Sequence, residues 1–576
     1  MKRRGFWFLL AILVICMAGV CEAAVYDYAY PTAETKKGLY VADGMEEDAL
    51  DLGVNHATIN IVISHMLAEE WQKTDEYSYS YEYGGQTYWF RKSVIDGYDT
   101  KLTRLSQGGC IVTGILLVEN RADYAGDLVY PAAKGKTANY YLWNMTDANA
   151  VAMIQAAVSF LQTRYGAPTG PRIVGWIVGN EVNNARDWNW GGAISFDTYM
   201  DIYAQEVVTV AAAARSIYSN ARVYISLDHY WNASMDTYWY AGKKVLTTFA
   251  AMMAARGYGN GTWCIACHPY NADLLDPDIL TKSSNVKKKA STAIITMRNL
   301  KVLTKFVKKH YSEGCRIILS EQGYSSSRSA KTQARSVALA YYIAEAYDMV
   351  DAFIYHRQVD HSAEAASGAA FGLYTSYGGE NAAGAKKAWR AYRCADSTQK
   401  NKFTKYAAKK AKKITGSKAK QTYKAATGTL KITKGLKVTE NYTAGGGGWG
   451  ALTSAVFENG VYTLVHDTTR NANVPWGIIR DGTINAKKLT KFVLALTVTG
   501  STSGRCDVYV RLYSGAKKYY ETHRVIGCGS QVNLMTDLKN WKARKNITRV
   551  KIMIRPKGGL WAEGASAVIS AMGLRK

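Results

Sequence analysis

The chain has 576 residues, of which 48% are hydrophobic and 20% charged, with only 8 Pro against 50 Gly. This composition excludes a disordered chain, a disulfide-stapled miniprotein and a collagen-like repeat. At roughly 150 residues per domain we expect two or three domains, each large enough to be stable without disulfide bonds.

The first residues have the pattern of a secretion signal. A Lys-Arg-Arg cluster at positions 2–4 precedes an apolar run over 6–20, and Cys21-Glu22-Ala23 resembles a small-residue cleavage site. The apolar run is shorter than the roughly 20 residues of a membrane-spanning helix. We therefore predict a signal peptide over 1–23 and a secreted, extracellular protein that associates with the cell surface.

The net charge of +26 is distributed unevenly along the chain. From Ala395 to the end there are 33 Lys and Arg against 9 Asp and Glu, a net charge of +24. Residues 24–394 contain 36 of each kind and balance. A neutral domain is therefore joined to a strongly basic one. Since export is expected, we predict an anionic cell-wall polymer, a membrane surface or an acidic glycan as its partner rather than nucleic acid.

The cysteines do not predict a disulfide framework or a metal site. Of 9 cysteines, two lie in the predicted signal, and the odd number that remains cannot all pair. The Cys264-x-x-Cys267 spacing has no second pair of cysteines to complete a zinc site. Cys506 and Cys528 form the one candidate bridge, a pairing that the sequence leaves open. We expect no metal and no cofactor.

Eight short apolar runs alternate with longer amphipathic stretches between residues 37 and 394. The runs cover 39–42, 57–63, 111–118, 173–178, 223–227, 263–267, 316–319 and 352–355. Most are rich in Ile, Val and Leu, as parallel strands buried on both faces are. The pattern predicts an α/β fold, a (β/α)₈ TIM barrel over 24–394. An open doubly wound sheet is the alternative, but no Gly-rich phosphate turn follows the first run.

An aromatic segment follows the second predicted strand. Tyrosines recur at positions 77, 79, 81 and 83, and Gly84-Gly85 precedes a second aromatic run over 87–90. Residues at every second position share one face of a strand, so the segment predicts an inserted β-hairpin. Two placements remain open, one over the C-terminal mouth of the barrel and one packed on its rim.

The chain changes character after residue 394. Residues 395–424 contain ten Lys against one acidic residue, which we interpret as a solvated basic linker. Short alternating runs then follow over 461–465, 492–498, 506–513, 549–554 and 567–572. This spacing predicts an all-β sandwich over 425–576, a basic domain suited to carbohydrate or cell-surface binding.

Two glutamates occupy equivalent places in the predicted barrel. Glu181 follows the fourth predicted strand, and Glu321 follows the seventh. A polar side chain just past the C-terminal end of a barrel strand points into the mouth, where active sites lie. Two carboxyl groups placed there are the groups that glycoside hydrolysis requires.

These positions carry a family resemblance over residues 37–394. Asn180-Glu181 and Ser320-Glu321-Gln322-Gly323 resemble the signatures of the retaining clan A glycoside hydrolases. The resemblance implies that Glu181 is the acid/base, Glu321 the nucleophile and Asn180 a ligand of the sugar 2-hydroxyl.

The segments after the sixth and eighth strands extend the comparison. His268-Pro269-Tyr270 also resembles the clan, which implies that Tyr270 hydrogen-bonds the nucleophile. After the eighth strand, where clan members often carry a Trp, this chain has Tyr355-His356-Arg357, so the identity of the sugar stays open.

Other residues near the predicted strand ends are candidates for binding sugar hydroxyls or stacking on sugar rings. A structural hydrogen bond or a place in the core is the alternative for each. The candidates are Asp228, His229, Tyr230, Trp188, Trp231, Tyr355 and His356.

The sequence as a whole predicts a secreted retaining glycoside hydrolase that acts on a poly- or oligosaccharide by double displacement. The alternative is a non-catalytic glycan-binding or cell-surface adhesion protein on the same scaffold. An extracellular nucleic-acid binder is disfavoured because the basic half contains no recognised nucleic-acid motif.

Overall fold

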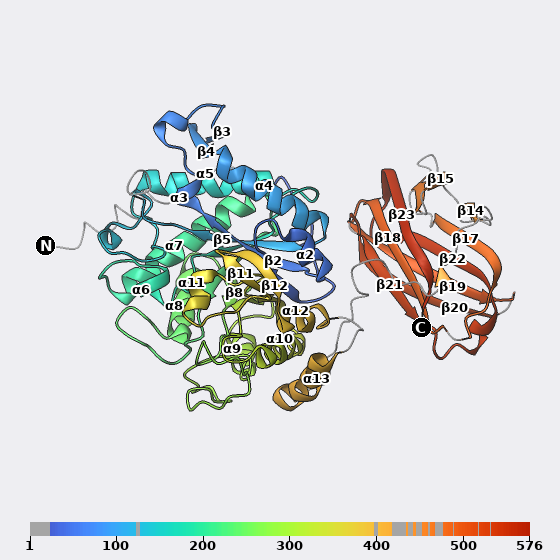
Figure 1. Ribbon diagram of the computed structural model, residues 1–576. Helices are drawn as coiled ribbons and strands as arrows, with labels where there is room; N and C mark the ends of the chain where they lie inside the picture. Colours follow the sequence, from blue (N-terminus) through green and yellow to red (C-terminus); the bar gives the residue numbers. More distant parts are fainter. Residues whose placement is uncertain are drawn as a thin grey trace.

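The computed structural model describes residues 24–121, 127–396 and 401–416, and in the C-terminal part residues 434–435, 442–444, 452–458, 461–466, 476–487, 489–515, 518–529 and 531–575. The predicted signal peptide lies outside the described residues. The described part consists of a barrel followed by a pair of sheets (Figure 1). No described helix is both long enough and apolar enough to cross a membrane.

Eight parallel strands close the barrel, in the order β1-β10-β9-β8-β7-β6-β5-β2. This confirms the predicted TIM barrel, and each predicted run overlaps one strand. The strands are β1 (Lys37–Tyr40), β2 (His56–Val62), β5 (Ile111–Leu117), β6 (Gly175–Val178), β7 (Arg222–Leu227), β8 (Cys264–Cys267), β9 (Ile317–Gln322) and β10 (Val350–Tyr355).

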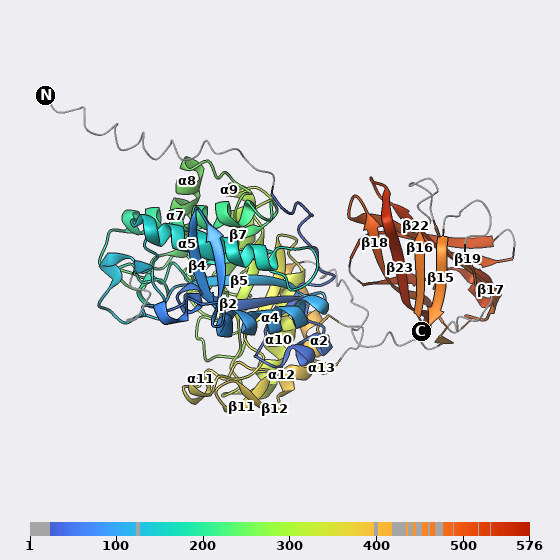
Figure 2. The same cartoon turned by 90° about the horizontal axis from the view of Figure 1, so that it is seen from above.

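Helices surround the strands on the outside of the barrel (Figures 1 and 2). Because the helices cover the outer face and side chains fill the interior, the strands are apolar on both faces; Ile115, Ile177 and Ile354 belong to the inner cluster. The helices are α2 (Glu46–Asp51), α3 (Ile63–Met66), α4 (Lys92–Gln107), α5 (Ala148–Tyr165), α6 (Ala185–Trp188), α7 (Phe196–Arg215), α8 (Gly242–Ala255), α9 (Lys301–His310), α10 (Ala330–Glu345), α11 (Ser362–Ala366) and α12 (Lys387–Arg393).

The predicted hairpin is present as β3 (Ser78–Tyr83) and β4 (Gln86–Arg91). It packs on the outer helix α5: Phe90 stacks on Phe160 with ring centroids 4.4 Å apart, and the Tyr81 hydroxyl lies 2.8 Å from the Ser159 hydroxyl. Of the two placements that the sequence left open, packing on the side of the barrel is the one that these contacts support.

The prediction of a solvated linker over 395–424 is wrong at its N-terminal end. Asp396 is buried and pairs with Lys37 at 2.8 Å. Helix α13 (Lys402–Thr415) then packs on α10. Its residues Phe403, Ala407 and Ala411 are buried and belong to the hydrophobic cluster that includes the helix layer of the barrel. These side chains recur at i, i+4 and i+8, so they form an apolar stripe between the lysines.

The C-terminal strands form two antiparallel sheets, as the sequence predicts. One runs β15-β16-β23-β18-β21, with β13 pairing β23, and the other runs β14-β17-β22-β19-β20. Each of the five predicted runs overlaps a strand. The strands are β13 (Lys434–Gly435), β14 (Tyr442–Ala444), β15 (Leu452–Glu458), β16 (Val461–His466), β17 (Trp476–Ile484), β18 (Lys491–Ser501), β19 (Arg505–Ser514), β20 (Lys518–Gly527), β21 (Val532–Asp537), β22 (Ile547–Pro556) and β23 (Trp561–Arg575).

This C-terminal domain has a core of its own, in which Trp476, Phe492 and Val510 are buried. Cys506 and Cys528 are both free cysteines in this structure, and the interaction between their thiols raises the pKa of Cys506 and lowers that of Cys528. The candidate bridge therefore joins two residues that are neighbours in the fold.

Candidate active site

The turn after β6 places Glu181 at the C-terminal mouth of the barrel. Gly179 has φ +70°, and Glu181 itself has φ +43°, the left-handed region that side chains other than glycine rarely adopt. The turn is anchored to β7, because the backbone N–H of Glu181 donates to the Ser226 hydroxyl at 3.0 Å and that of Val182 donates to the Ser226 carbonyl at 3.0 Å. A strained backbone held this firmly is typical of a functional site.

The Glu181 carboxyl contacts His268, which follows β8. Glu181 Oε1 lies 2.8 Å from His268 Nδ1, and the His268 side chain is 2% exposed against 14% for Glu181. Burial lowers the pKa of His268, but the charge of Glu321 and the hydrogen bond to Glu181 outweigh burial and raise it. His268 is therefore a buried imidazole within electrostatic reach of both carboxylates.

Glu321 is the penultimate residue of strand β9 and accepts a hydrogen bond from Tyr270. The Tyr270 hydroxyl donates to Glu321 Oε1 at 2.7 Å. Burial alone would raise the pKa of Glu321, but the charges of His356 and His268 and the Tyr270 hydrogen bond lower it below the usual value. Glu321 is thus held as a carboxylate, the form in which it is nucleophilic.

The loop after β10 supports Tyr270 from the other side. The Phe371 ring lies 5.8 Å from the Tyr270 ring and 6.3 Å from the imidazole of His356. Gly323 follows Glu321 at the point where this loop approaches most closely: a Cβ there would lie 2.3 Å from the His356 carbonyl oxygen. Only glycine fits between these two segments, which explains its place in the motif.

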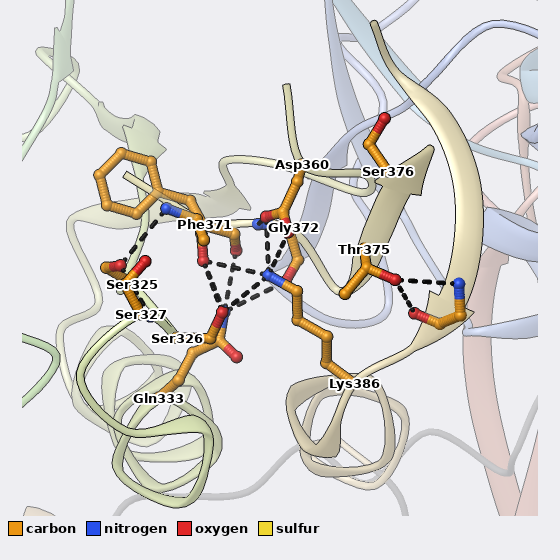
Figure 3. A network of polar contacts seen from close by, with 12 residues as sticks. Ser325, Ser326, Ser327, Gln333, Asp360, Phe371, Gly372, Thr375, Ser376 and Lys386 are labelled. Atoms are coloured by element: carbon orange, nitrogen blue, oxygen red, sulfur yellow. Dashed lines mark hydrogen bonds and ion pairs between the residues drawn. The ribbon is translucent and has the colours of Figure 1, made fainter. Parts of the chain in front are cut away.

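A buried polar network fixes the same loop (Figure 3). Lys386 pairs with Asp360 at 2.6 Å, and the two side chains are 6% and 5% exposed. The Gly372 N–H donates to the Asp360 carboxylate at 2.7 Å, and the Gln333 amide donates to the Phe371 carbonyl at 3.3 Å. A network with these partners holds the loop in one position against the site.

Asp228, at the end of β7, is a third carboxyl group near Glu181. It accepts hydrogen bonds from the side chain of Asn183, from the Tyr230 N–H at 2.7 Å and from the Trp239 indole at 2.6 Å. Burial and the charge of Glu181 raise the pKa of Asp228 to about 7, although these three donors favour its charged form. A proton on Asp228 therefore depends on the state of Glu181.

Four of the predicted binding residues follow β6 or β7 in the chain and are buried or half-buried. His229 is buried, and burial together with the charge of His268 lowers its pKa to about 4. Tyr230 is half-buried beside Trp239, with ring centroids 5.1 Å apart, and Trp188 is half-buried near Tyr140. Asn180, in the same turn as Glu181, is also half-buried.

Two of the predicted substrate contacts belong to the core instead. Trp231 is 3% exposed and packs edge-on against Phe306 of α9, and Tyr355 is fully buried and donates its hydroxyl to the Phe371 carbonyl at 2.6 Å. Neither ring face is open to a sugar. Arg357 forms ion pairs with Glu364 and Glu380, so its charge is already compensated.

Sequence reasoning missed four residues of the site: Ser226, Asn183, Trp239 and Phe371. Ser226 is a polar residue inside the apolar run of β7, and Asn183 follows two residues after Glu181, so both had a local signal. Trp239 and Phe371 lie in long loops, where the sequence gives no indication of their direction.

The fold and these residues define a (β/α)₈-barrel protein with two partnered glutamates at its C-terminal mouth. The chain belongs to a family of unknown function (DUF5722), whose model matches residues 29–422. The match spans the barrel and helix α13 and ends before the C-terminal sheets. No curated protein matches the chain.

Solved structures with low identity to this chain include glycosidases. A family 1 β-glucosidase from Thermotoga maritima is 11% identical, with 61% of this chain and 84% of that chain covered and a TM-score of 0.38. A bifunctional glucanase-xylanase protein from a metagenome library is 9% identical, with 92% and 97% covered and a TM-score of 0.36. At these identities the similarity concerns the fold alone.

Proposed function

We propose that the barrel hydrolyses glycosidic bonds in a poly- or oligosaccharide with retention of the anomeric configuration. The observation that carries the proposal is that Glu181 and Glu321 lie at the ends of β6 and β9 and that each has its own hydrogen-bond partner. Both glutamates also raise the pKa of the buried His268. Retaining glycosidases need two such carboxyl groups, one ionised and one able to exchange a proton.

In the first step, the Glu321 carboxylate attacks the anomeric carbon and forms a bond to it, while the bond to the leaving oxygen breaks. Glu181 gives its proton to that oxygen, so the departing sugar leaves as a neutral alcohol. In the second step, Glu181 takes a proton from a water molecule, whose oxygen attacks the anomeric carbon and releases Glu321 as a carboxylate.

The surroundings of the two glutamates support this division of roles. The lowered pKa of Glu321 favours the ionised nucleophile. Glu181 is paired with His268, whose imidazole can carry a proton. The Glu181 side chain is 14% exposed, which leaves it access to water. Because the sequence begins with a secretion-type pattern, we also propose that the enzyme acts outside the cell on extracellular glycans.

A glycan screen with matched variants tests the proposal. Wild-type protein, Glu181→Gln and Glu321→Gln are incubated with neutral and acidic polysaccharides, and products are followed by chromatography. We expect cleavage by the wild type and a loss of at least about 10³-fold in each variant, because each lacks one of the two reacting groups. Glu313→Gln, the same change at an exposed surface site, serves as the control and keeps full activity.

Two outcomes would contradict the proposal. Near wild-type turnover by either active-site variant, with an unchanged melting curve, would remove that glutamate from the chemistry. Binding of a glycan by the wild type without any cleavage would favour the non-catalytic glycan-binding protein instead.

A further inference from the structure

The segment that leads from β2 to the β3–β4 hairpin begins at the mouth of the barrel, although the hairpin itself packs on the barrel's side. Helix α3 follows β2 directly, and its His65 Nε2 lies 2.9 Å from Oε2 of Glu119, which comes two residues after β5. The Glu119 N–H also donates to the Ser64 hydroxyl at 3.1 Å. Because the C-terminal ends of parallel strands meet at one mouth, these contacts place the segment at the same end of the barrel as Glu181 and Glu321.

Tyr140 lies between Glu119 and the reacting glutamates. It is half-buried, packs on the inner barrel strands, and has its ring centroid 6.1 Å from that of Trp188. Its carbonyl accepts a hydrogen bond from the Trp190 N–H at 2.9 Å. Burial raises the pKa of Tyr140, and the charges of Glu119 and Glu321 raise it further. Tyr140 is therefore within electrostatic reach of both carboxyl groups and connects the β5 side of the mouth with the nucleophile.

A well-held turn presents Trp71 to solvent farther along the same segment. The 3₁₀ helix η2 (Glu70–Gln72) begins with a capping box, in which the Glu69 side chain accepts from the Gln72 N–H while the Glu69 N–H donates to Gln72 Oε1 at 3.1 Å. The Trp71 indole N–H donates to Glu69 Oε2 at 2.8 Å. Trp71 is nevertheless 63% exposed. A ring that is already oriented loses less entropy when a ligand binds to it.

Tyr77 adds a second exposed ring beside Trp71. The two ring centroids lie 5.6 Å apart with an interplanar angle of 61°, and Tyr77 is 45% exposed. The Tyr77 carbonyl accepts a hydrogen bond at 2.9 Å from the N–H of Lys92, the first residue of α4. An outer helix that follows a barrel strand begins near the mouth, so both rings lie at the rim of the mouth.

The exposed large apolar side chains of the barrel gather at this end. Among the described residues of the barrel, and apart from Val25 before the first strand, each of them lies after a barrel strand and before the outer helix α4, α8, α9 or α12. Exposed apolar side chains that gather in one region indicate contact with a ligand. They are Trp71, Tyr77, Met235, Leu274 and Tyr377.

The charges beside Trp71 are paired with charges of opposite sign. Glu70 pairs with Lys73 at 2.6 Å, and Glu69 lies 3.7 Å from the Arg121 guanidinium. Among these described residues the pairs leave no excess of positive charge for an anion, so a neutral ligand fits this surface better. Exposed rings next to hydrogen-bonding carboxylates suit a sugar, which has apolar ring faces and hydroxyl groups.

We propose that Trp71 and Tyr77 form a second sugar-binding subsite, which holds a neutral glycan chain that extends from the cleaved bond past Tyr140 to the rim after β2. This inference rests on the proposed function and specifies its substrate class as a neutral polysaccharide. Because Tyr140 and Glu119 lie between Glu321 and the rim, a chain that contacts both places is longer than a disaccharide. The affinity of the protein should therefore rise with chain length.

The test measures binding to full-length protein carrying Glu321→Gln, so that the probes stay intact. Isothermal titration calorimetry is performed with cellohexaose, mannohexaose, xylohexaose and maltohexaose, with the corresponding disaccharides, and with hexagalacturonate. We expect at least one neutral hexasaccharide to bind more tightly than its disaccharide and more tightly than hexagalacturonate. Adding Trp71→Ala should weaken binding of that hexasaccharide about 2- to 12-fold and leave binding of the disaccharide unchanged.

Two matched variants show whether the ring at this position is responsible. Trp71→Phe keeps an aromatic face and loses only the indole N–H, so it should retain most of the affinity. Tyr519→Ala removes a ring of the C-terminal domain that is 54% exposed and should bind as the unmodified protein does. Since Trp71 is exposed, both changes there should leave the melting curve unchanged.

The results separate this inference from the proposed function. A loss of affinity in Trp71→Ala supports the subsite even if the wild type cleaves no glycan, in which case only the proposed hydrolysis is contradicted. The subsite is overturned if no neutral hexasaccharide binds, if hexagalacturonate binds more tightly than all of them, or if Trp71→Ala retains full affinity. Equal losses in Trp71→Ala and Tyr519→Ala would overturn it as well.

Discussion

Replacing Tyr270 by Phe removes one hydrogen bond from the candidate nucleophile and little else. The lost hydroxyl donates to Glu321 Oε1 at 2.7 Å, while the ring keeps its contacts with Phe371 and His229. A hydrogen bond to a charged group contributes about 1.5–3 kcal/mol. If the bond orients and stabilises the attacking carboxylate, Tyr270→Phe should lower kcat/KM by about 10- to 150-fold.

The same change has a defined effect on the pH profile. The Tyr270 hydrogen bond is one of the interactions that lower the pKa of Glu321, so its loss raises that pKa. The acid limb of kcat/KM reports ionisation in the free enzyme and should move to higher pH. The assay is a set of initial rates from pH 4 to 9 on a substrate found in the glycan screen.

Tyr324→Phe is the matched control, because the buried Tyr324 hydroxyl has no hydrogen-bond partner among the described residues. It should leave both the rate and the acid limb unchanged. An unshifted acid limb in Tyr270→Phe, or the same shift in both variants, would refute the argument that Tyr270 acts on Glu321.

Three further predictions concern stability. Burial and Glu181 raise the pKa of Asp228 to about 7, so wild-type stability should fall as the pH rises from about 4 to about 7, and Asp228→Asn should lack this loss when unfolding is followed by circular dichroism. Lys386→Met leaves the buried carboxylate of Asp360 unpaired and should cost about 3–5 kcal/mol in urea unfolding. Phe403→Ala removes the buried ring that holds α13 on the barrel and should cost a similar amount, about 3–5 kcal/mol.

Each of these predictions has an outcome that contradicts it. Parallel pH–stability curves for Asp228→Asn and the wild type would exclude Asp228 as the titrating group. A loss of less than about 1 kcal/mol in Lys386→Met would mean that the Lys386–Asp360 pair contributes no more to stability than an exposed ion pair does. Lys409→Ala, an exposed change on the same helix as Phe403, should stay within about 0.5 kcal/mol. Equal effects of the two helix variants would mean that α13 does not pack as described.

The barrel could be predicted from the sequence because its strands are continuous apolar runs separated by amphipathic helices. The ends of the apolar runs also predicted where Glu181 and Glu321 lie. The C-terminal ends of parallel strands all meet at the same mouth of the barrel, so two residues at such strand ends lie at that mouth. The arrangement of these two glutamates therefore follows from periodicity and order along the chain.

Other features depend on contacts between distant segments. Trp231 and Tyr355 stand near strand ends, but their rings turn into the helix layer, a direction that backbone periodicity does not determine near a strand's end. The apolar stripe of α13 was not predicted because the lysines around Phe403 and Ala407 give that stretch a composition that is typical of a linker. Trp239 reaches Asp228 from a loop, and only the folded chain brings the two together.

The anomeric configuration of the first product tests the central claim most directly. Proton NMR spectra are recorded within the first minutes of hydrolysis, before the released sugar equilibrates between its anomers. Double displacement through Glu321 predicts that the new reducing end has the same configuration as the bond that was cleaved. A first product of inverted configuration would contradict the assignment of Glu321 as the nucleophile.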